Sequence, residues 1–374
     1  MVKYGRVPCA IFGSRGLVAQ RLLQRLINHN WLEPVIVVGS PLSVGTNVND
    51  LDWALDEEKP ELPSITVKGF EDIDLLISEM KYRGVQIIFS ALPNSIAVEV
   101  EEKIAKSGFF LISHAQIHRL KDHIPLVIPD VNPNQLNIID LQNYGSGALI
   151  SCCNCMAVPL AIAISPLYSK FDISSIKIIT EQSLSGGGRD MLLSGKSGVH
   201  IDCEIPGEEK SIVNELTNIF ASLNDDINQL KVPYIEAKCS RVMRDYGHLA
   251  IVEIDFSKDI SAHSIINSWQ EYIPLTKQLK LPSSPKQVIE LIDGKLNTDV
   301  HRWAGSESRD PNTDLSSAMS VAVGEVEVKG NKLKFTLVSD NTIRGAAGYS
   351  VLLAELILAD GILHDKNTIL NSPI

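Results

Sequence analysis

Three features are scarce in this chain of 374 residues, and each scarcity excludes a class of protein. It has 6 cysteines, too few for disulfide bonds to hold together a fold of this size. Its 34 Lys and Arg residues are outnumbered by 45 Asp and Glu residues, whereas binding to nucleic acid or to an anionic membrane needs a basic surface. No apolar run approaches the length of about 18 residues that a membrane-spanning helix needs. We therefore expect no nucleic-acid partner and no membrane partner.

The first residues, 1–13, lack the apolar core of a secretory signal peptide and lead directly into a strand-like stretch. Together with the small number of cysteines, this predicts a cytoplasmic protein whose thiols stay reduced. Hydrophobic residues make up 44% of the chain and charged residues 21%, a composition typical of globular proteins. The length predicts two domains with a sizeable core.

The first 150 residues alternate strand-like and helix-like segments. Short apolar runs predict strands at 7–12, 34–39, 85–90, 109–113 and 125–128. Helical patterns follow the first run over 17–27 and the third over 97–106. Strands that are apolar on both faces and alternate with helices are typical of a parallel, doubly wound sheet.

After about residue 150 the predicted strands are longer and alternate apolar with polar residues, at 175–181, 249–256, 319–328 and 333–339. Because no helix separates some of them, we expect antiparallel pairing in an α+β domain. Helices are predicted in the middle of 214–230 and from about 348 to 358. The polar segment 306–317 predicts an exposed loop or flap.

A glycine-containing turn, Gly13 to Ala19, lies between the first predicted strand and the first helix. Glycines at such a turn let the backbone approach a pyrophosphate, and the helix N-terminus offers free N–H groups to it. The same pattern also occurs in tight turns that bind nothing.

The end of the second strand indicates which dinucleotide is expected. A carboxylate there would bind the ribose 2′-hydroxyl of NAD, but this strand is followed by Ser40 and Ser43. We therefore expect NADP rather than NAD, with Arg15 supplying positive charge to the 2′-phosphate. Alternatively, Arg15 is a solvated residue at the start of the helix.

Three cysteines at 152, 153 and 155 lie where the two predicted domains meet and lead into a helix. A thiol at a helix N-terminus has a lowered pKa, which favours the nucleophilic thiolate. The alternative is that all three are small core residues. Zinc binding is not expected, because no second pair of ligands has suitable spacing.

Two further segments carry residues that are suited to catalysis or to substrate binding. Gln182 ends a predicted strand before a triple-glycine loop, and Arg241 and His248 flank a short loop. Arginine suits a substrate carboxylate, and histidine near a cysteine can act as its base and acid. Each could equally be structural, because spacing alone does not show that the segments meet.

The order of these motifs resembles the aspartate-semialdehyde dehydrogenase family, most closely its archaeal and fungal branch, over essentially the whole chain. The segments that carry the resemblance are GSRGLVA (13–19), SALPNSIAVEVE (90–101), SHAQIHR (113–119), IPLVIPDVNP (124–133), NC (154–155), QSLSGGG (182–188), RVMRDYGH (241–248), AMSVAVGEV (318–326) and DNTIRGAAGYSVLLAEL (340–356). The resemblance implies NADP-dependent reductive dephosphorylation of L-4-aspartyl phosphate to L-aspartate 4-semialdehyde through a cysteine thioester.

The resemblance also implies a role for individual residues. Cys155 is the implied nucleophile, His248 the acid and base, and Gln182 a residue that orients the substrate or the thiol. The implied substrate-binding residues are Arg241, Glu208, Lys210 and Asn154. The expected cofactor-binding residues are Gly13, Ser14, Arg15, Gly16, Leu17, Val18, Ser40, Ser43, Ser90, Leu92, Ser185, Gly186, Asn341 and Gly345. No metal is expected.

The implied fold is a Rossmann-type domain, residues 1–150 completed by a C-terminal helix within 345–374. A catalytic and dimerisation domain, 151–344, would resemble the C-terminal domain of glyceraldehyde-3-phosphate dehydrogenase. The expected assembly is a homodimer or homotetramer that acts on a small-molecule substrate.

The chain departs from the family pattern at the expected phosphate site. His114 stands where the family has Asn, Gln116 replaces a phosphate-binding Arg or Lys, and Ile117 replaces an Asn. The GEEK segment ending at Lys210 is one residue short. Malonyl-CoA and succinyl-CoA reductases share the fold and also lack that basic residue, so an acyl-CoA reductase is the alternative. A non-catalytic paralogue is the third possibility, and the joint presence of Cys155, His248, Gln182 and Arg241 argues against it.

Overall fold

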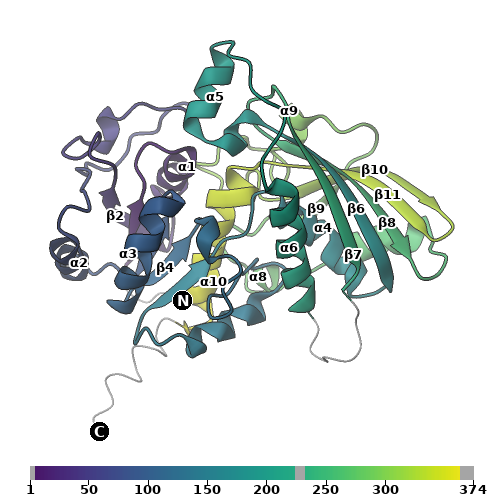
Figure 1. Cartoon of the computed structure of the whole chain (residues 1–374), viewed down its shortest axis with the longest axis horizontal. Helices are drawn as coiled ribbons and strands as arrows, with labels where there is room; N and C mark the ends of the chain where they lie inside the picture. The colour runs from purple at the N-terminus through teal and green to yellow at the C-terminus, as the bar shows by residue number, and fades with distance from the viewer. Residues whose placement is uncertain (1–4, 224–231, 363–374) are drawn as a thin grey trace, which may run out of the picture.

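The computed structural model describes residues 5–223 and 232–362, which form two β-sheets surrounded by helices (Figure 1). The first sheet has the strand order β2-β1-β3-β4-β5, and each neighbouring pair is parallel. Its strands are β1 (Val7–Phe12), β2 (Leu32–Val38), β3 (Ile87–Ser90), β4 (Phe110–Ser113) and β5 (Ala148–Ser151), and the connecting helices are α1 (Leu17–Leu26), α2 (Ile73–Tyr82) and α3 (Asn94–Lys106). The predicted parallel, doubly wound sheet is confirmed.

Helices cover both faces of this sheet because its strands are apolar on both sides. In β1, Cys9 and Ile11 pack into the core that contains the buried face of α1. The alternate residues Ala10 and Phe12 pack on the opposite face, among residues of α2 and α3. Successive side chains of a strand point to opposite faces, so one apolar run supports two helical layers.

The predicted strand at 125–128 is wrong. In that segment only Leu126 forms a β-bridge, to Ser151, and the fifth strand of the sheet is β5. Both segments are short apolar runs that are almost completely buried. Only 148–151 lies alongside β4, and tertiary packing decides which of the two segments takes that place.

The second sheet has the order β7-β6-β8-β11-β10-β9. Its strands are β6 (Ile173–Gln182), β7 (Tyr234–Arg241), β8 (His248–Phe256), β9 (Ile289–Leu291), β10 (Val321–Lys329) and β11 (Lys332–Ser339). The pairs β6–β8, β8–β11 and β10–β11 are antiparallel as predicted, whereas β6–β7 and β9–β10 are parallel. The remaining helices are α4 (Ala157–Tyr168), α5 (Arg189–Lys196), α6 (Glu208–Ala221), α7 (Ala262–Gln270), α8 (Leu275–Gln278), α9 (Thr298–His301) and α10 (Gly348–Ala359).

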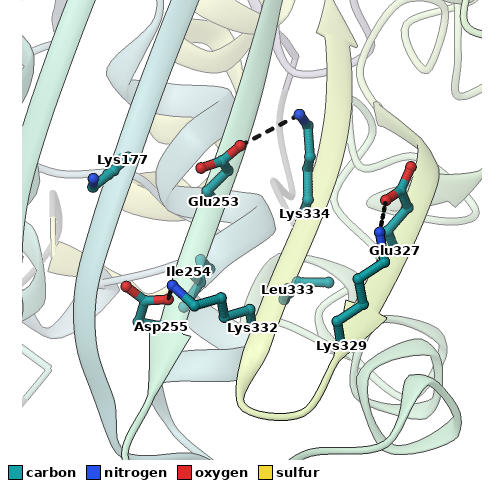
Figure 2. A pocket seen from close by; sticks show the side chains of 9 residues that line it. All are labelled: Lys177, Glu253, Ile254, Asp255, Glu327, Lys329, Lys332, Leu333 and Lys334. Atoms are coloured by element: carbon teal, nitrogen blue, oxygen red, sulfur yellow. Dashed lines mark hydrogen bonds and ion pairs between the residues drawn. The ribbon is translucent and has the colours of Figure 1, made fainter.

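One face of the second sheet packs against helices, and the other is a charged surface. Helices α4, α6 and α7 pack on the sheet, which explains the alternating burial along β6. On the opposite face, β8, β10 and β11 carry the ion pairs Glu253–Lys334, Asp255–Lys332 and Glu327–Lys329 around a shallow depression (Figure 2). Exposed pairs of this kind contribute at most about 1 kcal/mol each, so they add polarity more than stability.

Two helices, α4 and α10, are buried almost throughout. The apolar pattern predicted the second, from 348 to 358. The helix predicted within 214–230 is observed as α6, which begins earlier, and residues 224–230 of that prediction lie outside the described part of the chain.

The segment 306–317 is irregular, as predicted, but it is not a free flap. Its backbone carbonyl at Leu315 accepts a hydrogen bond from Arg25 of α1, and Asn312 pairs with Asn28 at 3.1 Å. The segment is therefore anchored to the first sheet's helical layer.

Within 5–223 and 232–362, no helix is long and apolar enough to cross a membrane. In the same ranges, no group of three or more His, Cys, Asp or Glu side chains could hold a metal ion.

Candidate active site

Two adjoining cavities lie where the two sheets meet. A groove of about 810 Å³ runs over the glycine turn after β1, and a second cavity of about 720 Å³ contains Cys155. Leu92, Arg189 and Gly16 line both. Because the cavities share these walls, a ligand in the groove can reach the cysteine.

The structure brings Cys155 and His248 together. Cys155 lies in the turn just before α4, and His248 is the first residue of β8. The sulfur Sγ is 3.4 Å from the ring nitrogen Nε2 of His248. Residues 93 positions apart in sequence therefore form a pair with the geometry of a thiol and its base.

The expected lowering of the Cys155 pKa is wrong for this geometry. Withdrawal from solvent and the nearby Glu208 carboxylate raise the thiol pKa to about 12, and Arg119 and Arg241 only partly oppose this. Burial together with Arg241 and Arg244 also lowers the pKa of His248 to about 3. The resting pair is thus a thiol beside a neutral imidazole.

The neighbouring cysteines have the environment of core residues. Cys152 and Cys153 are almost fully buried, and Tyr349 Oη accepts a hydrogen bond from the Cys153 backbone N–H. Burial raises the pKa of Cys152 to about 12 and that of Cys153 well above its ordinary value. Of the three thiols, Cys155 is the one that lies against a histidine.

A carboxylate network forms one wall of the cavity. Glu208 Oε1 accepts hydrogen bonds from Gln182 Nε2 at 2.8 Å and Asn154 Nδ2 at 3.0 Å. Asn154 Oδ1 in turn accepts the backbone N–H of Met156 at 2.7 Å, next to the start of α4. These three predicted site residues are held in fixed orientations beside Cys155.

The positive charge of the cavity comes from residues other than Lys210. Lys210 is exposed on α6 and is not among the residues that line the cavity, so its expected place at the phosphate site stays a prediction. The arginines that line it are Arg241, Arg119 and Arg189. The sequence analysis missed the last two, although Arg189 directly follows the triple glycine.

Each of these arginines also forms a hydrogen bond or an ion pair within the protein. Arg241 Nη1 donates to the Ser183 carbonyl at 2.8 Å. Arg119 Nη1 pairs with Glu215 at 3.1 Å, and Arg189 with Asp52 at 3.4 Å. These contacts orient the buried Arg241 and the mostly buried Arg119, whereas the partner of Arg189 is an exposed carboxylate.

Two of the predicted glycines are required by close contacts. A Cβ on Gly186 would lie 2.7 Å from Arg241 Nη1 and 3.0 Å from His248 Nε2. A Cβ on Gly345 would lie 2.6 Å from the Cys155 carbonyl oxygen. Gly345 belongs to a single π-helical turn, Ile343–Ala347, that brings the backbone against the cysteine.

The glycine turn has the geometry of a dinucleotide cradle. Gly13 has φ +106°, and a Cβ there would lie 3.3 Å from the Ala91 carbonyl oxygen. A Cβ on Gly16 would meet nothing within 4 Å, which leaves the start of α1 open to a ligand. The residues present therefore fit a pyrophosphate at this helix N-terminus.

The other predicted cofactor residues divide into two groups. The residues that line the cavities are Gly13, Ser14, Arg15, Gly16, Leu17, Val18, Ser40, Leu92, Ser185, Gly186, Asn341 and Gly345. Ser43 and Ser90 do not line them: Ser43 is buried beneath the turn, 2.8 Å from Ser14, and Ser90 donates to the buried Glu101. These two serines therefore form buried hydrogen bonds next to the cavities rather than lining them.

Gln116 is a neutral cavity side chain where the family pattern has a basic residue, and the nearby positive charge is Arg119, which donates to the His114 carbonyl at 3.3 Å. Gln116 and His114 line this far end of the cavity, and Gln116 is exposed. His114 Nε2 is buried without a hydrogen-bond partner in the described part of the chain. Burial and Arg119 lower the His114 pKa to about 3, so this ring is neutral.

Comparison with known proteins supports the resemblance. Residues 8–139 match the family described as "Semialdehyde dehydrogenase, NAD binding domain". The chain is 30% identical to an aspartate-semialdehyde dehydrogenase of Archaeoglobus fulgidus over 96% of this chain and 100% of that one. It is also 30% identical to a malonyl CoA reductase (NADP) of Metallosphaera sedula, over 96% and 99% of the two chains.

The fold matches solved structures as well. A structure of aspartate semialdehyde dehydrogenase with NADP from Candida albicans superposes with a TM-score of 0.77 at 24% identity, covering 96% of this chain and 100% of that chain. That likeness shows the two-domain fold, and the 30% identity to the Archaeoglobus fulgidus protein extends over nearly the whole length of both chains. The chain belongs to the aspartate-semialdehyde dehydrogenase family.

Proposed function

We propose that the protein is an NADP-dependent reductase that converts L-4-aspartyl phosphate to L-aspartate 4-semialdehyde through a thioester on Cys155. The observation that carries this proposal is the contact of 3.4 Å between Cys155 Sγ and His248 Nε2 in a cavity lined by Arg241. A thiol, a base and a carboxylate-binding arginine are the groups that acyl transfer from this substrate needs.

In the proposed reaction, His248 Nε2 takes the Cys155 proton as Sγ attacks the acyl carbon. The C–S bond forms, the bond to the phosphate oxygen breaks, and phosphate leaves. Arg241 pairs with the substrate carboxylate, while Glu208, held by Gln182 and Asn154, lies where a substrate ammonium group can bind. When the aldehyde forms, the C–S bond breaks and Cys155 is regenerated.

Bound NADPH supplies the hydride that reduces the thioester. Gly13 to Val18 would hold its pyrophosphate, and Asn341 and Gly345 line the cavity next to Cys155, where the nicotinamide would lie. Ser40 stands just after β2 where a carboxylate would favour NAD, and Arg15 and Arg189 line the groove together with the carboxylates Glu71, Glu99 and Asp190. Residues 1–150 with the C-terminal helix would form the cofactor domain, and 151–344 the catalytic domain.

A second candidate is an acyl-CoA reductase, favoured by the neutral Gln116 and by the similarity to the Metallosphaera sedula protein. Two activity assays and a measurement of Cys155 reactivity on the purified protein separate the three functions. Phosphate-dependent oxidation of aspartate semialdehyde supports the first proposal, and CoA-dependent oxidation of malonate semialdehyde supports the second. Activity with neither substrate, together with an unreactive Cys155, would favour a non-catalytic paralogue. Each assay is run with NADP and with NAD to test the cofactor.

The proposed assembly is a cytoplasmic homodimer or homotetramer joined through the open face of the second sheet. That face carries both signs of charge, so a twofold axis could bring Lys residues of one copy opposite Glu and Asp residues of the other (Figure 2). Light scattering of the wild-type chain, and of the Lys332→Glu and Lys334→Glu variants, tests this. A monomeric wild type would contradict it.

A further inference from the structure

Ser183 is in contact with the imidazole of His248, and nothing above assigns it a role. Its backbone N–H lies 3.1 Å from His248 Nδ1, and its hydroxyl Oγ lies at the same distance. On the other edge of the ring, Nε2 faces the Cys155 sulfur. Ser183 and His248 are both fully buried, so Ser183 controls the surroundings of Nδ1.

The two groups of Ser183 favour different forms of the ring. The backbone N–H can only donate, so it favours an Nδ1 that carries no proton, with the ring proton on Nε2. In that form Nε2 cannot take the thiol proton of Cys155. Only a ring with its proton on Nδ1 can do so, and that N–H needs an acceptor, which the hydroxyl oxygen of Ser183 can be.

The hydroxyl proton of Ser183 has a place to go when its oxygen accepts from His248. Ser183 Oγ lies 3.1 Å from Asn341 Oδ1 and 3.0 Å from Ser185 Oγ. Asn341 Oδ1 also accepts the Gly247 N–H at 3.1 Å, which holds the amide in place. The chain His248 Nδ1, Ser183 Oγ, Asn341 Oδ1 is therefore continuous and buried.

We propose that Ser183 is a positioning residue that enables His248 to act as the base for Cys155. When the S–H bond breaks and the proton moves to Nε2, a thiolate and an imidazolium form. Ser183 Oγ accepts from Nδ1–H of that imidazolium and donates its own proton to Asn341 Oδ1. The inference rests on the proposed function in taking Cys155 as the nucleophile.

The charges around His248 make such an acceptor important. Arg241 and Arg244 disfavour the imidazolium, whereas Asp340 and a hydrogen bond to the Gly247 backbone favour it. Burial acts in the same direction as the two arginines. A hydrogen-bond acceptor at Nδ1 therefore adds stabilisation to a form that burial and the two arginines oppose.

The first test is the rate at which iodoacetamide alkylates Cys155 as pH is varied, in wild type and in Ser183→Ala. The variant keeps the backbone donor and loses the acceptor, so alkylation at neutral pH should slow by roughly 10- to 100-fold. Its rate profile should also move to higher pH. Ser183→Thr keeps a hydroxyl and should restore both. A wild-type profile in Ser183→Ala, or no rescue by a folded Ser183→Thr, overturns the proposal.

The second test is ¹⁵N NMR of the His248 ring, which distinguishes protonated from unprotonated ring nitrogens. Ser183→Ala should shift the population toward the form with an unprotonated Nδ1. Ser174→Ala removes an exposed hydroxyl whose contact is Ser257 rather than His248, and it should leave the His248 spectrum as in wild type. An equal shift in both variants overturns the proposal. Neither test uses substrate or cofactor, so failure of the acyl-donor assays would contradict the proposed function alone.

Discussion

The two ends of the catalytic cavity differ in how their polar groups are held. Around Cys155, the Glu208 carboxylate accepts hydrogen bonds from both Gln182 and Asn154. Because Gly186 has no Cβ, the His248 and Arg241 side chains can pack against its backbone. At the far end, Gln116 is exposed, and His114 has a buried nitrogen without a partner in the described part of the chain. The polar groups around Cys155 are thus held by more hydrogen bonds than those around Gln116 and His114.

The largest expected effect is at the Cys155 end of the cavity. Cys155→Ala should reduce turnover by roughly 10³-fold or more, because no other group there can form the thioester. Cofactor binding, measured by fluorescence titration, should be unchanged, since the groove lies over the first sheet. Cys152→Ala and Cys153→Ala are the matched controls and should keep most of the turnover. An equal loss in either control would show that the nucleophile is misassigned.

Arg241→Ala should mainly raise KM for a carboxylate substrate, because the lost pair exists in both the ground state and the transition state. Loss of a bidentate charge pair costs about 2–3 kcal/mol, or roughly 30- to 150-fold in KM. Steady-state kinetics measure this, with Arg241→Lys as the variant that keeps the charge. An unchanged KM in Arg241→Ala would show that its contact with the Ser183 carbonyl is its main role.

His114 at the far end should affect stability at acidic pH. Its pKa is lowered to about 3 in the folded chain, so the unfolded chain binds more protons below the ordinary value of about 6.5. The contribution of the neutral His114 ring to the free energy of unfolding is fully present above pH 6.5 and is lost as the pH falls toward 3. His114→Asn should therefore reduce the loss between pH 7 and pH 5 by about 2 kcal/mol, measured by urea unfolding. If the variant loses as much unfolding free energy between pH 7 and pH 5 as the wild type, the burial of this ring is contradicted. Substitution of the exposed His123 is the control.

The smallest expected effect is at Gln116. A hydrogen bond from a neutral amide to phosphate is about half as strong as one from a charged donor. The KM for phosphate in the reverse direction should therefore be high. Gln116→Arg should lower this KM by about tenfold or less, and Gln116→Glu should raise it. If neither substitution moves the KM, phosphate binds elsewhere, and Arg119 or Arg189 becomes the candidate anion contact.

The sequence alone was sufficient for features that depend on local pattern. Alternating apolar runs and helical periodicity predicted the parallel sheet, and the buried helix α10 followed from an apolar stretch. The segments around Cys155 and His248 were chosen from residue type and motif order, which do not depend on knowing their distance in space.

What the tertiary structure decided are the properties that depend on neighbours distant in the chain. Of two similar apolar runs, 125–128 was predicted as the fifth strand but 148–151 forms it, because only the second run pairs with β4 along its length. Lys210 is exposed on α6, whereas Arg119, in the turn that follows β4, lines the cavity because the packing of the two sheets brings that turn beside Cys155. The Cys155 pKa is raised, although a position before a helix predicted the reverse, because the desolvation of the thiolate depends on all the atoms packed around it.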